Sequence, residues 1–154
     1  MKSLNASNLL LQIDDAIKDI KSFTSASHLE QAYLAKFLVV YICGIYEEVV
    51  ETIVNEMVSM IRNNGISNFV KSSLGNNFRN PDTEKIGELL GRFNPTWKAA
   101  VRSIPRQNRD ALNSIVENKN ALAHGQPITV TLAEVYKYHS DAMYVINTID
   151  NLLL

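Results

Sequence analysis

The sequence predicts an all-α fold, an up-and-down bundle of four main helices joined by short connecting helices. Three observations lead to this prediction. Apolar residues recur at helical spacing along almost all of the 154 residues. Only 6 Gly and 4 Pro interrupt the chain, so the regular segments are long. The one stretch with strand character, residues 128–130, is too short to make a sheet. We expect a single domain over residues 1–154.

The first half of the chain predicts two long helices. Residues 9–20 carry one amphipathic stripe, and a Ser/Thr-rich break follows at residues 22–27. Ser27 and Glu30 fit a capping box that begins a second helix over about residues 29–61. The Asn-Asn-Gly sequence at residues 63–65 is a stop signal for that helix, and the polar stretch after it predicts at most a short helix over 69–74.

The second half predicts two short helices and then two long ones. Asn-Pro pairs open the short helices, with Asn80 and Asn94 as the caps. Pro105 begins the third main helix, which stops at Gly125. A second capping box at residues 131–134 starts the terminal helix.

Composition excludes several classes of function. Lys and Arg number 15 and Asp and Glu 16, so no global basic field gathers nucleic acid and any such contact is local. The most apolar run, residues 37–46, is too short to span a bilayer, and no signal peptide is recognisable, which predicts a cytoplasmic protein. The single cysteine, Cys43, excludes an internal disulfide and is expected to be buried. His28 and His139 are expected at the surface or at helix ends, outside any metal-ligand spacing.

The most informative stretch is residues 117–125, on the third main helix. Lys119 falls near the middle of the apolar stripe, where an ammonium is costly without a partner or access to solvent. A structural ion pair with Glu47, Glu48 or Glu51 of the second helix is the simplest alternative to a functional role.

Asn120 and His124 lie four residues apart and therefore share a face beside that stripe. His124 is the last helical residue before Gly125, where the helix dipole favours imidazolium and a neighbouring ammonium opposes it. Such a histidine can move a proton near neutral pH. The alternatives are that His124 only caps the helix and that Asn120 bonds to nearby backbone.

These residues resemble a known signature, the Arg-Asn-x-x-x-His motif of the HEPN superfamily, and most closely its RiboL-PSP type. The resemblance extends over residues 25–154. It also rests on an acidic pair in the second helix, Glu47 and Glu48, and on the patterns at residues 86–93 and 130–138.

The resemblance implies a HEPN-like bundle and a metal-independent endoribonuclease without a cofactor. Its partners would be a second copy of the chain, an RNA substrate and, in a toxin–antitoxin or phage-defence system, an antitoxin protein. His124 would be the catalytic histidine, Asn120 the polar residue of the motif, and Lys119 would replace the family's arginine. That replacement keeps the charge and loses the bidentate geometry. The alternative is a non-catalytic HEPN module for dimerisation, interaction or RNA binding.

Two further groups could support the site. Glu47 and Glu48 could orient a motif residue or simply pair with a basic side chain. A local basic patch of Arg102, Arg106 and Arg109 precedes the motif, and it either guides an RNA backbone or is a solvated face.

Overall fold

The computed structural model describes residues 1–23 and 27–154 and confirms the all-α prediction. Within this described part the helices are α1 (Leu4–Ser22), α2 (His28–Ser59), α3 (Asn64–Asn77), α4 (Thr83–Phe93), α5 (Pro95–Ser103), α6 (Arg106–Ala123) and α7 (Leu132–Leu153). Residues 128–130 form no strand. Of the predicted break at residues 22–27, residues 24–26 lie outside the described part. None of the described helices is long and apolar enough to cross a membrane.

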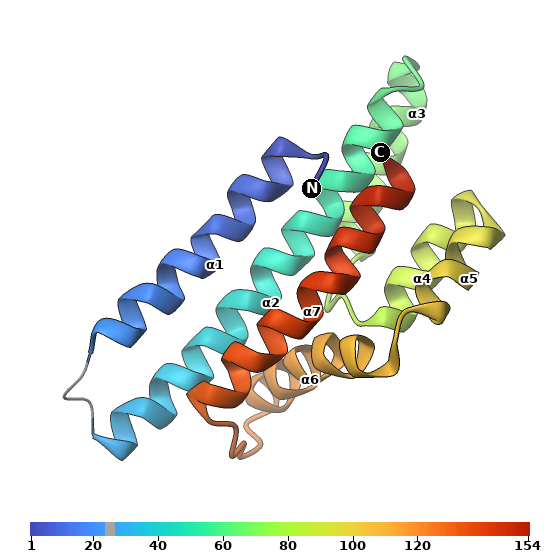
Figure 1. The fold of residues 1–154 in the computed structure, drawn as a ribbon. Helices are drawn as coiled ribbons and strands as arrows, with labels where there is room; N and C mark the ends of the chain where they lie inside the picture. Colours follow the sequence, from blue (N-terminus) through green and yellow to red (C-terminus); the bar gives the residue numbers. More distant parts are fainter. Residues whose placement is uncertain (24–26) are drawn as a thin grey trace.

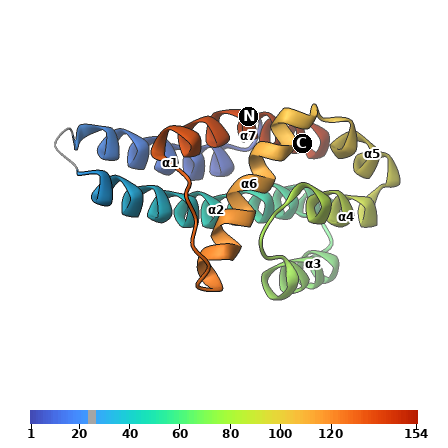
Figure 2. The same cartoon turned by 90° about the horizontal axis from the view of Figure 1, so that it is seen from below.

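Helix α2 is the centre of the bundle. It packs against α1, α3, α6 and α7 (Figure 1). Seen from below, α1 and α7 lie on one side of α2, whereas α3 and the last turns of α6 project on the other (Figure 2). Twelve α2 residues are buried, so this helix supplies much of the core.

Local signals set most helix ends. The predicted capping boxes form at Ser27–Glu30 and Thr131–Glu134, where each hydroxyl accepts a backbone N–H and each carboxylate accepts another in return. Asn94 caps α5 with Pro95 in the first turn, as predicted.

The prediction for residues 63–82 was wrong in two respects. Asn63 caps α3, which extends over 14 residues rather than forming a short helix, because the Asn-Asn-Gly sequence begins this helix. The cap of α4 is Asp82, not Asn80. Asn80 instead adopts a left-handed backbone with φ of 54°, a conformation that asparagine tolerates better than most residues.

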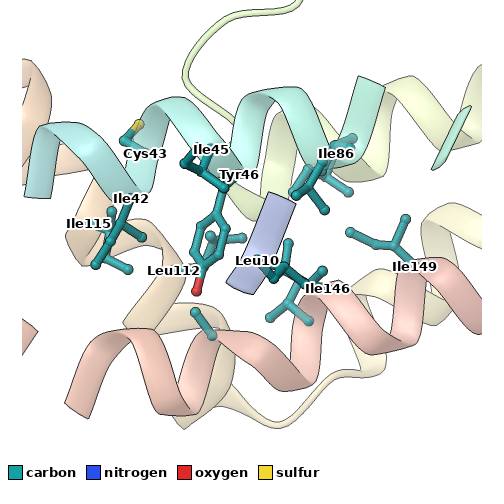
Figure 3. Packing of buried hydrophobic residues seen from close by; sticks show 14 of the residues in the cluster. Leu10, Ile42, Cys43, Ile45, Tyr46, Ile86, Leu112, Ile115, Ile146 and Ile149 are labelled. Carbon is teal, nitrogen blue, oxygen red and sulfur yellow. The ribbon is translucent and has the colours of Figure 1, made fainter. Parts of the chain in front are cut away.

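A polar cluster joins three helices and extends from the core to Asp14, whose side chain is 65% exposed. The Tyr46 hydroxyl of α2 lies 2.8 Å from Nδ1 of His139 of α7, and Nε2 of that ring lies 3.5 Å from Oδ1 of Asp14 of α1. The carboxylate favours a proton on Nε2, so Tyr46 donates to Nδ1. Figure 3 shows the Tyr46 side chain reaching from α2 toward α7 among apolar neighbours.

His139 is therefore a buried residue, and the expectation of a surface or helix-end position was wrong. It continues the stripe of Val135, Ala142 and Ile146, which faces the core at helical spacing. Burial lowers the pKa of His139, although the Asp14 carboxylate opposes this shift. Burial also raises the pKa of Tyr46.

The two chain ends meet beside α7. The carboxylate of Asp150, fully buried, accepts the backbone N–H groups of Lys2 and Ser3, the latter at 2.9 Å. Ser3 in turn caps α1 by accepting the N–H of Ala6. The start of α1 is thus fixed to the end of α7.

Candidate functional site

The motif residues lie at the end of α6, which stops in a defined turn. The N–H of Gly125 donates to the Leu122 carbonyl at 3.0 Å, and the N–H of Gln126 donates to the Ala121 carbonyl at 2.8 Å. This pair of bonds is a Schellman motif, and Gly125 adopts the left-handed conformation that it needs, with φ of 69°. The turn leaves His124 as the exposed C-cap residue.

Lys119 is half-buried and has a neutral partner. Its Nζ donates to Oδ1 of Asn80 at 2.6 Å. Within the described residues Lys119 forms no direct ion pair with Glu47, Glu48 or Glu51. From the sequence, such a pair was the alternative to a functional role. The left-handed turn at Asn80 presents this amide to α6.

Glu47 holds the turn that carries Asn80. One carboxylate oxygen accepts the N–H of Asn80 at 3.0 Å, and the other accepts Nη1 of Arg79 at 2.6 Å. Nη2 of Arg79 donates to the Gly75 carbonyl at 2.9 Å, at the end of α3. Glu47 therefore contacts the residue that also accepts the Lys119 ammonium, and it pairs with a basic side chain as well.

The other acidic residues of α2 contribute less directly. Glu48 is exposed, and in the described part of the chain no hydrogen bond or ion pair joins it to the motif. Burial raises the pKa of Glu51; Arg79 opposes this rise, and the Glu47 and Glu48 carboxylates add to it. Its Oε1 atom is buried without a hydrogen bond and lies 3.9 Å from Nη1 of Arg79.

Asn120 and His124 have more open surroundings. Asn120 is half-buried and His124 is exposed. The last turns of α6, which end at the His124 C-cap, project past α2 (Figure 2). The side chain that bonds to backbone within this helix is Asn118, whose amide donates to the Ser114 carbonyl at 2.8 Å. The segment after α6 returns beside the first turns of α2, where residues 128–132 and His28 line a shared cavity of about 200 Å³.

Cys43 is buried next to this network, as predicted. Burial raises the pKa of its thiol to about 11, against the smaller lowering effect of Lys119. The thiol is therefore protonated at neutral pH and is not a nucleophile. Among the described residues, no group of three or more His, Cys, Asp or Glu side chains is placed to hold a metal ion.

The three arginines of the predicted basic patch do not lie together in the structure. Arg102 and Arg109 line one cavity together with Lys98, between α4, α5 and α6. Arg106 lies outside that lining and pairs with Asp110, with 3.2 Å between Nε and Oδ2. Sequence reasoning missed Lys98, Arg79 and Asn80 as site residues, because each acquires its neighbours only when distant helices pack.

Comparison with known proteins identifies the family. No curated protein and no solved structure matched the chain. The sequence profile described as RiboL-PSP-HEPN matches residues 2–154, nearly the whole length. This extent agrees with the all-α fold and with the motif at the end of α6. The chain belongs to the RiboL-PSP-HEPN family.

Proposed function

We propose that this protein is a metal-independent endoribonuclease that cleaves RNA between two copies of the chain. The observation that carries this proposal is the position of the motif at the projecting end of α6. There His124 is exposed and Asn120 shares its face, while Lys119 lies half-buried beside them. An imidazole, an amide and an ammonium are thus gathered at one accessible helix end of a HEPN-family protein.

RNA cleavage needs no metal because the substrate carries its own nucleophile. A neutral histidine removes the proton of the 2′-hydroxyl, whose oxygen then attacks the adjacent phosphorus. The bond from phosphorus to the 5′-oxygen breaks, and an imidazolium protonates the leaving oxygen. The products are a 2′,3′-cyclic phosphate and a 5′-hydroxyl. Lys119 offsets the charge that develops on the phosphate oxygens.

One His124 cannot be both base and acid in the same step, which is the reason for proposing a dimer. His124 of the partner subunit supplies the second role. An uncovered apolar stripe on the N-terminal half of α2 supports a second copy at this face. Its members are 46–67% exposed: Leu29, Tyr33, Phe37 and Val40. The segment that follows α6 lies beside the same turns of α2.

One observation favours a second candidate, a HEPN module that binds RNA or a partner without cleaving. The ammonium of Lys119 is already bonded to Asn80, and lysine offers a point charge where the family has a planar guanidinium. In that case Lys119 would mainly join α6 to the turn before α4.

The direct test is cleavage of single-stranded RNA in EDTA by the wild type and by His124→Ala. We expect cleavage by the wild type and a loss of about 100-fold or more in His124→Ala, a typical contribution of a general acid or base. Lys18→Ala is the control, because Lys18 is likewise exposed but lies on α1, away from both the motif and the uncovered stripe of α2. Thermal unfolding of each variant separates lost chemistry from lost folding.

The outcomes distinguish the two candidates. RNA that stays intact in EDTA while bound to the protein would favour the non-catalytic module. Equal cleavage by wild type and His124→Ala would contradict the assignment of the motif. For the cellular setting, we place the protein in the cytoplasm as the toxic component of a toxin–antitoxin or phage-defence system. Expression of the wild type should then stop growth, whereas expression of His124→Ala should not.

A further inference from the structure

A basic cavity lies where α4, α5 and α6 meet. Its volume is about 280 Å³, and Thr83, Gly87 and Val101 form part of its wall. Four charged side chains line it: Lys98, Arg102 and Arg109 as cations and Glu84 as the one carboxylate. The lining therefore has an excess of two positive charges, in a protein whose overall net charge is −1.

Two of the cations are held in place by the fold. Nε of Arg109 donates to the Ile104 carbonyl at 3.0 Å, which fixes the guanidinium and leaves its other N–H donors available. The stem of Lys98 packs on α4 where that helix has glycine. A Cβ on Gly91 would lie only 3.2 Å from Cβ and Cδ of Lys98, so the glycine lets the lysine stem pack closely on α4.

The polar wall of the cavity is also ordered. Oδ1 of Asn113 accepts the N–H of Thr83 at 2.9 Å and its hydroxyl at 3.1 Å. Because both bonds use the amide oxygen, the amide nitrogen remains as a donor. Such a set of guanidinium, ammonium and amide donors suits the oxygens of a phosphate group.

The cavity and the motif are connected through the same two elements. Arg109, Asn113, Asn120 and His124 follow one face of α6 at spacings of 4, 7 and 4 residues. The start of α4 and the turn before it bond to α6 at both places, Thr83 to Asn113 and Asn80 to Lys119. Arg109 and Lys119 are separated by roughly 15 Å along the helix axis, which a few nucleotides can span.

We propose that this cavity is a phosphate-binding subsite that holds the RNA backbone a few nucleotides away from the scissile bond. The inference rests on the proposed ribonuclease function and adds to it the residues that hold the substrate. Arg106 is not part of the subsite, because it pairs with Asp110 outside the cavity.

The first experiment measures binding of a fluorescein-labelled single-stranded RNA by anisotropy over a range of salt concentrations. All proteins carry His124→Ala, so that the RNA stays intact. The test variant adds Lys98→Gln and Arg102→Gln. The matched control adds Arg106→Gln and Lys18→Gln, which also removes one arginine and one lysine from exposed positions.

We expect the test variant to bind at least about tenfold more weakly at low salt. The slope of its affinity against salt concentration should fall by about 0.7 for each RNA phosphate that the protein no longer neutralises. The control should bind within about twofold of the parent, since it removes charges that touch no RNA phosphate. Equal weakening of both variants would overturn the inference, because it would indicate a diffuse charge effect.

The second experiment titrates inorganic phosphate into the protein with nitrogen-15-labelled arginine and follows the Nε–H resonances. The resonances of Arg102 and Arg109 should shift together, and that of Arg106 should not. If phosphate shifts these resonances while RNA binding is unaffected by the test variant, the cavity binds a free anion and the RNA subsite is excluded. If no protein binds RNA, the proposed function fails, and the phosphate titration still shows whether the cavity takes an anion.

Discussion

Two histidines of this chain occupy opposite settings. His139 lies inside the bundle, where Tyr46 and Asp14 contact its two ring nitrogens. His124 lies at the exposed end of α6, where the backbone turn positions it and its ring is open to solvent. The same side chain is therefore structural in one place and available for chemistry in the other. What separates the two settings is access, since of these two rings only that of His124 is exposed to solvent.

The largest expected effect concerns the second copy, on which the proposed role of His124 depends. Phe37→Glu places a carboxylate in the uncovered stripe of α2, and burying an unpaired charge costs several kcal/mol. We expect dimerisation to weaken by at least about 100-fold, which corresponds to roughly 2.7 kcal/mol, and cleavage to be lost with it. Light scattering after size exclusion measures the mass. Leu11→Glu, on exposed α1, is the control and should stay dimeric.

The interior histidine should matter for stability alone. Tyr46→Phe leaves Nδ1 of His139 without its donor in a buried position. Such a loss should lower the free energy of unfolding by about 1–3 kcal/mol, measured by urea denaturation. Tyr144→Phe, at an exposed tyrosine, should change it by less than about 0.5 kcal/mol. Equal effects of the two substitutions would contradict the structural role of the Tyr46–His139 contact.

The pH dependence of stability sharpens the same contrast. Because the pKa of His139 is lowered on folding, the folded state prefers the neutral ring. Its contribution to stability is present above about pH 6.5, the pKa in the unfolded chain, and is lost as the pH falls through the lower folded value. We expect His139→Gln to flatten the fall of the free energy of unfolding between pH 7 and pH 5. If His139→Gln leaves this pH dependence unchanged, the His139 ring does not determine how the free energy of unfolding varies with pH.

The smallest effect concerns Lys119. Lys119→Arg restores the residue of the family motif beside Asn80 and should change stability by less than about 0.5 kcal/mol. A planar guanidinium offers phosphate two parallel bonds, so we expect a few-fold rise in the cleavage rate. Lys119→Met should lower that rate. A rate unaffected by both substitutions would make Lys119 a structural residue only.

The long helices could be predicted because their signals are local. Two capping boxes, one Asn-Pro start and Gly125 all lie within a few residues of the helix ends they determine. The prediction failed at Asn80 because its conformation depends on Glu47 and Lys119, residues 33 and 39 positions away. An Asn-Pro pair alone does not reveal such contacts.

The error at His139 and the missed grouping of Lys98 have different origins. The position of His139 was readable, since it continues the apolar stripe of α7, although a lone histidine is more typical of a surface or helix-end position. The grouping of Lys98 with Arg102 and Arg109 was not readable, because it requires the crossing of α5 and α6 beside α4. The motif could thus be located in the sequence, whereas the grouping of the cavity residues could be seen only once the helices were packed.

The central claim is that His124 from each of two copies is needed at one site. The most direct measurement uses a heterodimer of wild type and His124→Ala, purified through a different tag on each chain. Its cleavage rate in EDTA is compared with the rates of both homodimers. If the two copies supply base and acid, the heterodimer should be nearly as inactive as the His124→Ala homodimer. A heterodimer with half of the wild-type rate would show that each copy works alone and would contradict the account.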